Sequence, residues 1–134
     1  MKFTISADPV AQGRPRFFRR GRFVGTYDPP KSKEFKKRVA QEATKTGFFQ
    51  GHGALRVVAR FYLARPKRMK ASLCGSDPVE HHKRPDLDNL LKGLFDGMKG
   101  VVYSDDSQVQ EIKAQKFYHG VLESPRVEVE IVEV

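Results

Sequence analysis

The residues most able to do chemistry are carboxylates gathered in two short stretches of a strongly basic chain, residues 83–92 and 104–107. In a basic protein we would expect acidic side chains to be scattered and solvated. A concentration of oxygen ligands instead suggests a cation site, and the basic surroundings suggest that this site works on a polyanion. The groups concerned are the carboxylates Asp86, Asp88, Asp105 and Asp106, the amide Asn89 and the amine Lys92.

The spacing of Asp86 and Asp88 makes this a geometric prediction. On a continuous helix two residues two positions apart point about 200° away from each other, so they could not share a cation. Pro85 changes this, because proline favours an extended residue before it and suits a position at a helix start. If the chain is extended through Asp86 and the helix begins near Asp88, both carboxylates can converge at its N-terminus, where the helix dipole favours negative charge.

Each feature also has an ordinary structural explanation. One of the first two aspartates could be a helix N-cap, and Asp105 and Asp106 could form a polar turn. Asp88, Lys92 and Asp96 follow at four-residue steps, so they could be surface ion pairs that contribute about 0.3–0.5 kcal/mol each. A single magnesium-type site would account for all of these residues with one explanation instead of three.

Such a site would suit phosphodiester hydrolysis. Mg²⁺ prefers oxygen ligands and is commonly held by a few carboxylates together with substrate phosphate. The metal activates water and offsets charge on the phosphoryl group, and a nearby lysine such as Lys92 can stabilise that charge or position the attacking water. The spacing leaves open whether one metal ion or two would bind.

The composition places the chain among globular basic proteins. Its 134 residues suffice for one domain over 1–134, and 39% hydrophobic residues can build a core. The net charge of +9 indicates an acidic partner, of which nucleic acid is the commonest. The single cysteine, Cys74, fits a reducing compartment, and no apolar run approaches the roughly 18 residues that cross a bilayer. We therefore expect a cytoplasmic protein that makes no membrane contact.

A basic segment near the N-terminus is a candidate DNA-binding arm. Residues 12–38 carry ten lysines and arginines against two acids, and aromatic residues are interleaved with the arginines. We expect the arginines to contact phosphates and the aromatic rings to stack on bases or wedge between them. The alternative is a solvated basic surface whose aromatic residues lie in the core. The DNA-binding candidates are Arg14, Arg16, Phe17, Arg19, Arg20 and Arg22, together with Lys67 and Arg68 farther along.

The hydrophobic pattern predicts an α+β fold with two main helices packed on a mixed or antiparallel sheet of about five strands. The predicted helices cover residues 31–46 and the segment from about residue 88 to Met98, where apolar residues recur with helical spacing. A long polar connection, 65–84, contains His81 and His82, which we interpret as solvated or phosphate-facing and not as metal ligands. The predicted strands cover residues 3–7, 54–63, 101–103, 109–118 and 126–134.

The acidic residues also carry a resemblance to a known family. The sequence Arg84-Pro-Asp-Leu-Asp-Asn-Leu-Leu-Lys92, followed by Phe95-Asp96 and by Asp105-Asp106-Ser-Gln108, resembles the signature of the RusA family of Holliday junction resolvases. This family occurs in bacteria and is often encoded by prophages. The segments Gly13-Arg-Pro-Arg16 and Tyr27-Asp-Pro-Pro30 also resemble family members, so the resemblance extends over most of the chain. The 65–84 connection is the part that aligns least.

The resemblance implies a homodimeric, Mg²⁺-dependent endonuclease that introduces paired nicks in four-way DNA junctions during recombination and repair, with Mn²⁺ as an alternative metal. Asp86, Asp88 and Asp106 correspond to the metal-binding catalytic aspartates of the family, and Lys92 to its catalytic lysine. Asn89, Asp96 and Asp105 also match the pattern, and their roles remain open. Two alternatives are a nuclease for other branched DNA such as flaps, and a non-catalytic module that binds nucleic acid.

Overall fold

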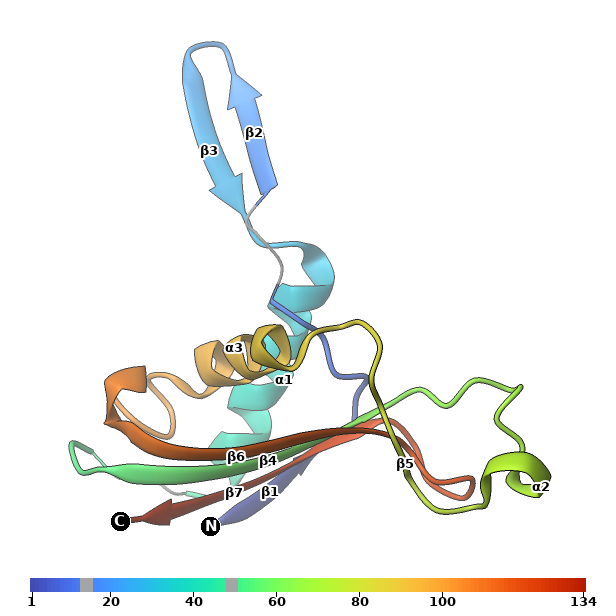
Figure 1. The fold of residues 1–134 in the computed structure, drawn as a ribbon. Helices are drawn as coiled ribbons and strands as arrows, with labels where there is room; N and C mark the ends of the chain where they lie inside the picture. The colour runs from blue at the N-terminus through green and yellow to red at the C-terminus, as the bar shows by residue number, and fades with distance from the viewer. Residues whose placement is uncertain (13–15, 48–50) are drawn as a thin grey trace.

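Five strands form one mixed sheet, and two helices cover one of its faces (Figure 1). The computed structural model describes residues 1–12, 16–47 and 51–134. A separate hairpin of two strands stands away from this body as an arm (Figure 1). The predicted α+β class, with two main helices and a sheet of five strands, is confirmed.

The sheet alternates buried and exposed residues along its central strand. In spatial order its strands are β1 (Lys2–Ile5), β7 (Arg126–Glu133), β4 (Leu55–Leu63), β6 (Val109–Tyr118) and β5 (Val79–Glu80). β4 and β6 are parallel, and the other neighbours are antiparallel. The fully buried side chains of β4 that alternate along the strand are Leu55, Val57, Ala59 and Phe61. These residues give the helices an apolar face on which to pack.

The two long helices are α1 (Pro30–Lys45) and α3 (Leu87–Met98). They approach closely at Gly97 of α3, because a Cβ atom built there would lie 2.7 Å from Cβ of Val39 on α1. A Cβ atom at Gly93, one turn earlier, would lie 2.9 Å from the carbonyl oxygen of Val10. These contacts fix the position of α3, which carries Asp88 and Asp96 and has Asp86 at its N-cap. Among the described helices, none is long and apolar enough to span a bilayer.

The segment 101–103, which the sequence predicts as a strand, is a turn. The backbone N–H of Val102 donates to the carbonyl oxygen of Met98 at 2.9 Å, which continues the end of α3. The β contact that the structure describes here is an isolated bridge between Lys99 and Tyr103. The strand prediction is wrong because Val102 and Tyr103 are fully buried in the core, and burial of a turn produces the same apolar pattern as strand pairing.

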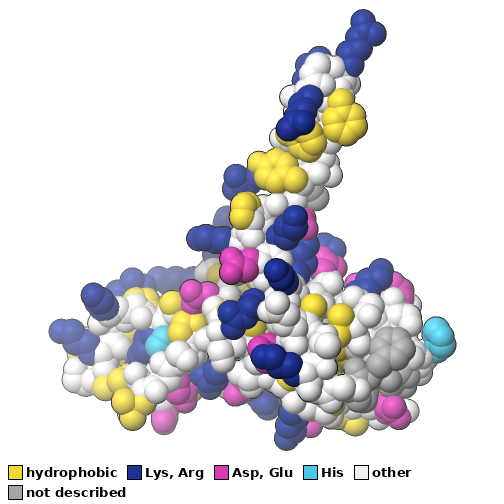
Figure 2. Space-filling view, turned by 180° about the vertical axis from the view of Figure 1, so that it is seen from behind, with side chains coloured by type: hydrophobic (Ala, Val, Ile, Leu, Met, Phe, Trp, Pro, Cys, Tyr) yellow, Lys and Arg dark blue, Asp and Glu magenta, His cyan; other side chains and the backbone are white. Residues whose placement is uncertain are grey.

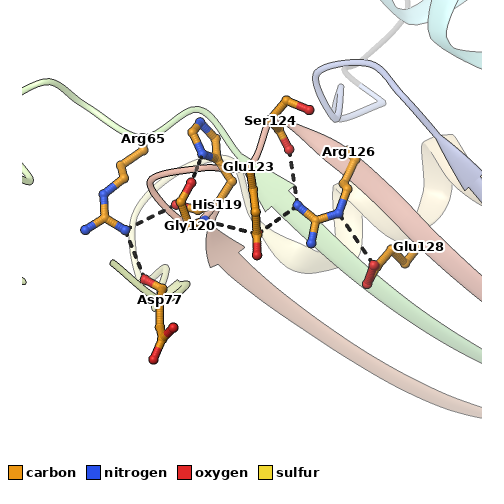
Figure 3. A network of polar contacts seen from close by, with 8 residues as sticks. All are labelled: Arg65, Asp77, His119, Gly120, Glu123, Ser124, Arg126 and Glu128. Atoms are coloured by element: carbon orange, nitrogen blue, oxygen red, sulfur yellow. Dashed lines mark hydrogen bonds and ion pairs between the residues drawn. The ribbon is translucent and has the colours of Figure 1, made fainter. Parts of the chain in front are cut away.

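The 65–84 connection is more ordered than a structureless loop. It contains a short helix, α2 (Ala71–Cys74), and strand β5. Arg65 organises it, since its guanidinium donates at 2.6–3.2 Å to the carbonyl oxygens of Met69, Gly75, Asp77 and His119. Figure 3 shows Arg65 bridging Asp77 and His119, close to a second network around Arg126. The Arg65 side chain thus donates hydrogen bonds to backbone carbonyl oxygens that would otherwise need water.

His81 lies in this connection and is buried, which corrects the prediction of a solvated or phosphate-facing side chain. Its ring lies against Tyr118 of β6, with ring centroids 4.4 Å apart. Its backbone N–H donates to the carbonyl oxygen of Lys116 at 3.2 Å, beside the short β5–β6 pairing. His82 is exposed, as expected. Pairing at the sheet edge therefore turns one histidine inward and leaves its neighbour outside.

Candidate active site

Asp86 and Asp88 lie at the start of α3, where Pro85 predicts a helix to begin. Asp86 occupies the N-cap position with extended backbone angles (φ −71°, ψ 143°), and the helix begins at Leu87, one residue before the predicted position. The positive end of the helix dipole therefore faces this pair of carboxylates. A hollow beside the helix start is lined by Arg84, Pro85, Asp86 and Asn89.

The ordinary structural roles, a helix cap and surface ion pairs, account for these residues only in part. The carboxylate of Asp86 makes no capping hydrogen bond although it stands at the N-cap position. Oδ1 of Asp88 accepts a hydrogen bond from the backbone N–H of Asn89 at 2.9 Å, and the residue is exposed. Within the described part of the chain, Lys92 forms no ion pair with Asp88 or Asp96. The charges on this face of α3 therefore remain available to a ligand.

Lys116 of β6 holds the backbone that leads into Asp86. Its Nζ donates to the carbonyl oxygens of Lys83 at 2.6 Å and Pro85 at 2.8 Å. Charged hydrogen bonds of this kind are about twice as strong as neutral ones. The sequence gives no signal for this role, because the partners lie more than thirty residues away and are backbone atoms.

The second acidic group lies in a tight turn after α3 that contains the 3₁₀ helix η1 (Asp106–Gln108). Asp105 caps this helix by accepting from the backbone N–H of Ser107 at 3.3 Å, while Oε1 of Gln108 accepts from the backbone N–H of Asp105 at 3.2 Å. Asp105 also pairs with Lys99, with 2.8 Å between Oδ1 and Nζ. Asp105 therefore orients the turn, a role that the Asp-x-x-Gln spacing of a capping box could have indicated.

Two further side chains fasten this turn to the rest of the molecule. Nε2 of Gln108 donates to the carbonyl oxygens of Gly51 at 2.6 Å and Gly53 at 3.0 Å, in the segment before β4. The Tyr103 hydroxyl donates to the carbonyl oxygen of Phe95 on α3 at 3.2 Å. The turn is thus held at a fixed position relative to both the sheet and α3.

Asp106 lies in the same turn, with its side chain next to Tyr103. Its Oδ1 is buried and has no hydrogen-bond partner in the described part of the chain. Leaving a buried acceptor unsatisfied costs about 1–3 kcal/mol, more for a charged group, so such atoms often mark functional sites. Burial raises the pKa of the Tyr103 hydroxyl far above its usual range, and the negative charge of nearby Asp106 adds to this shift.

The charges around the turn influence one another. The Lys99 ammonium and the Ser107 hydroxyl and N–H hold the pKa of Asp105 well below its usual range. The pKa of Lys99 is raised by its hydrogen bond to Asp105, and the negative charges of Asp106 and Asp96 contribute further. Asp96 therefore belongs to the acidic group near the turn.

The acidic residues form two groups, one at each end of α3. Asp88 and Asp96 are eight residues apart, which corresponds to about 12 Å along the helix axis. In the described residues, no three His, Cys, Asp or Glu side chains form a group that could hold a metal ion. Asp86, Asp88 and Asp106 are thus not a preassembled ligand set, and their joint role stays a prediction.

The chemistry of these groups nevertheless fits Mg²⁺. Asp86 offers a carboxylate that does not cap its helix, and Asp106 offers a buried oxygen without a partner. Mg²⁺ usually keeps several waters and binds one or two carboxylates plus substrate phosphates, so it does not need a closed protein cage.

The basic arm is a hairpin formed by β2 (Arg16–Arg20) and β3 (Phe23–Tyr27). Figure 2 shows hydrophobic and basic side chains along its length. Phe17 is 76% exposed and Phe23 is 62% exposed, so the alternative that these aromatic residues belong to the core is wrong. Arg14 lies outside the described residues, while Arg16, Arg19, Arg20 and Arg22 are all exposed.

The remaining candidates are placed as follows. Lys67 and Arg68 are exposed on the 65–84 connection, beyond the end of β4. Asn89 lies in the first turn of α3, and its carbonyl oxygen accepts from the backbone N–H of Gln12 at 3.0 Å. This bond ties the start of the basic segment to the helix that carries the acidic residues.

Comparison with known proteins identifies relatives of the chain and its family. The chain is 38% identical to the uncharacterized protein YqaN of Bacillus subtilis (strain 168), and the match covers 100% of the chain and 96% of that protein. It is 50% identical over 52 residues, 38% of the chain and 37% of the other protein, to a protein of Lactococcus phage r1t named crossover junction endodeoxyribonuclease rusA. Residues 6–132 match the family described as Endodeoxyribonuclease RusA. The chain therefore belongs to the RusA endodeoxyribonuclease family.

Proposed function

We propose that this protein is a metal-dependent endonuclease that cuts branched DNA, with four-way (Holliday) junctions as its main substrate. The observation that carries the proposal is that two carboxylates keep oxygen atoms available to a ligand, since Asp86 does not cap its helix and Oδ1 of Asp106 is buried without a hydrogen-bond partner in the described part of the chain. Family membership supports the choice of DNA as substrate. The basic arm, which is joined to the start of α1, supports a polyanionic substrate.

Asp86, Asp88 and Asp106 would hold Mg²⁺ or Mn²⁺. When bound, the metal supplies polarisation of the scissile phosphate and of the attacking water. Lys92, exposed on the same face of α3 as Asp88, would bind a phosphate oxygen and stabilise the charge that develops on it. Asn89 and Asp96 flank these groups on the helix and would orient water or phosphate.

The exposed arginines of the arm would neutralise phosphates and position the DNA relative to α3. Such contacts carry no sequence information, which suits an enzyme that recognises a branched shape. Lys67 and Arg68 would extend the basic surface beyond the end of β4. Binding should therefore weaken steeply as the salt concentration rises.

The enzyme would act as a homodimer. A four-way junction has two-fold symmetry, and two nicks on opposite strands require two active sites related by a matching two-fold axis. Each chain supplies one set of acidic residues, so a dimer supplies the two sites.

The test is cleavage of a synthetic four-way junction by the wild type and by an Asp88→Asn variant. The wild type should cut in Mg²⁺ and not in a chelator, and Asp88→Asn should lower the rate on the order of 100-fold because a metal ligand is lost. DNA binding should survive, since the phosphate contacts remain. Asp77→Asn, which removes an exposed carboxylate on the 65–84 connection, is the matched control and should cut normally.

Other results would point to the two alternative functions. Binding of junction, duplex and single strands without products in any metal would indicate a non-catalytic module. Faster cleavage of flaps than of four-way junctions would indicate a nuclease for other branched DNA. Undiminished cleavage by Asp88→Asn would show that Asp88 is not part of the active site.

A further inference from the structure

The two faces of the β2–β3 arm differ in composition. In this hairpin residues of the same face alternate along each strand and lie opposite their cross-strand partners. The register pairs Arg16 with Tyr27, Phe18 with Gly25 and Arg20 with Phe23, and these six residues form one face, called here the aromatic face. The other face carries Phe17, Arg19, Val24 and Thr26.

The rings of the aromatic face form a continuous stripe. The centroid of the Phe18 ring lies 5.9 Å from that of Phe23 and 6.2 Å from that of Tyr27. Gly25 makes this possible, because a Cβ atom there would lie 2.6 Å from the Phe18 ring. Phe18 can therefore lie across the neighbouring strand, and its ring joins the other two.

The stripe is exposed and has arginines beside it. Phe23 is 62% exposed, Tyr27 45% and Phe18 37%. Arg16 and Arg20 stand on the same face, and the sequence from 16 to 27 contains no acidic residue. On the other face Arg19 is engaged by its own turn, since its Nε donates to the carbonyl oxygen of Gly21 at 2.9 Å.

The base of the arm is fastened to the body. Asp28, directly after β3, forms an ion pair with Lys36 of α1 and accepts a hydrogen bond from Nε2 of Gln12 at 3.3 Å. The hydrogen bond from Lys36 holds the pKa of Asp28 below its usual value, so the Asp28 carboxylate is ionised at neutral pH. The arm thus presents the aromatic face from a fixed base next to α1.

We propose that the aromatic face of the arm binds unpaired bases of branched DNA by stacking, while Arg16 and Arg20 bind the flanking phosphates. Aromatic rings interleaved with arginines are the surface that single-stranded nucleic acid prefers, because every base has a face on which a ring can stack. In a continuous duplex every base is stacked on both sides, whereas the terminal base pairs of the arms at a branch point can unstack and open. The inference rests on the proposed function and names the part of the branched DNA that the arm recognises.

A second copy of the chain is a poorer occupant of this face. Pairing two arms face to face would bring Arg16 and Arg20 of each copy together without a single carboxylate from residues 16–27 to neutralise them. The phosphates of DNA supply the negative charge that the arm lacks.

The experiment measures binding in a chelator, so that no cleavage occurs, to a four-way junction that carries 2-aminopurine at the branch point. Stacking should quench the fluorescence of the probe when the wild type binds. Phe18→Ala and Phe23→Ala should each lose quenching and weaken binding about tenfold, in the range known for base–aromatic stacking. Val24→Ala, on the opposite face and 60% exposed, is the control and should behave as the wild type.

Two further variants separate the rings from the charges. Gly25→Val displaces the Phe18 ring without changing any charge, so it should lose quenching while the slope of log affinity against log salt stays constant. Arg16→Gln should lower that slope by about one. Unchanged melting temperatures would show that the body of each variant is folded.

Three results would overturn the inference. In the first, Phe18→Ala quenches the fluorescence of the probe as strongly as the wild type does. In the second, Phe17→Ala loses more of this quenching than Phe18→Ala does. The third is dissociation of Phe18→Ala into monomers that still bind the probe as the wild type does, which would make the face a contact between chains. Because binding is read without metal, a protein that quenches the probe but never cuts DNA would contradict the proposed nuclease and leave the stacking face standing.

Discussion

At the scale of single residues, Lys116 shows how a side chain outside the acidic stretches can govern them. It bridges the carbonyl oxygens of Lys83 and Pro85, immediately before Asp86. Catalysis is sensitive to displacements of about 1 Å in the groups that hold the reacting atoms. Lys116 is therefore a positioning residue, and its removal should disturb the direction of the Asp86 carboxylate without removing any ligand.

We predict that Lys116→Met lowers kcat for junction cleavage about 10- to 100-fold and changes KM little, because the charged bonds to the backbone are lost while the DNA-binding surface persists. Lys116→Arg should restore part of the rate. Lys113→Met removes an exposed charge from the same strand and is the control for net charge. Steady-state kinetics that show a rise in KM with unchanged kcat would mean that Lys116 is a DNA contact instead.

The unsatisfied oxygen of Asp106 predicts how the protein responds to metal. Mg²⁺ that binds the folded state should raise the melting temperature, by an amount equivalent to about 1.4 kcal/mol at ten times the dissociation constant. EDTA should reverse the shift. Asp106→Asn removes a carboxylate whose Oδ1 is buried without a hydrogen-bond partner in the described part of the chain, so this variant should respond less to Mg²⁺ than the wild type does.

Differential scanning fluorimetry with and without Mg²⁺ measures both effects. Asp77→Asn should respond to Mg²⁺ as the wild type does. A full metal response in Asp106→Asn would show that this carboxylate is not a ligand, and would leave Asp86 and Asp88 as the metal-binding pair.

Among the helices and strands, the features that depend on neighbouring residues can be predicted from the sequence, and the features that depend on distant contacts cannot. The helix that carries Asp88 and Lys92 was recognisable because its apolar residues repeat with helical spacing and Pro85 marks its start. The buried turn at 101–103 was mistaken for a strand, because apolar content does not distinguish the two. β5 and the inward position of His81 depend on pairing with β6, more than thirty residues farther along the chain, so no neighbouring residue could indicate them.

The pairing of β5 with β6 makes stability depend on pH through His81. Burial lowers the pKa of His81 below its ordinary value of 6.5, and the positive charges of Lys116 and His82 contribute. At this residue the unfolded chain therefore binds a proton more readily than the folded chain does. The contribution of His81 to the free energy of unfolding should be constant above about pH 6.5 and should fall as the pH drops toward the lowered pKa.

We predict that His81→Phe, which keeps a ring against Tyr118, flattens this part of the pH dependence. Urea denaturation at pH 7.5 and at pH 5.5 measures it. His82→Gln, at the exposed neighbouring position, should retain most of the pH dependence of the wild type, because burial and Lys116 contribute more to the lowered pKa of His81 than His82 does. An equally steep loss of stability in His81→Phe would assign the effect to another group.

At the scale of the whole molecule, the acidic residues and the arm must act on the same DNA. The arm is joined to the N-terminal end of α1, and α1 crosses α3 at Gly97, so the basic and acidic parts are connected through closely packed helices (Figure 1). One chain offers one set of acidic residues and one arm. A junction that is cut on two strands requires both sets in the same complex, which makes the oligomeric state a test of the mechanism.

We predict that sedimentation gives twice the chain mass of 15.3 kDa and that the dimer makes paired cuts. A supercoiled plasmid with an extruded cruciform reports this directly, because two nicks in one encounter give linear DNA and separate nicks give open circles. The wild type should yield linear DNA as its first product. Co-expression with an excess of Asp88→Asn should yield mostly open circles, since mixed dimers hold one working site, whereas co-expression with Asp77→Asn should not. Independent monomers would instead give open circles first with the wild type alone, and the mutant chain would only dilute the rate.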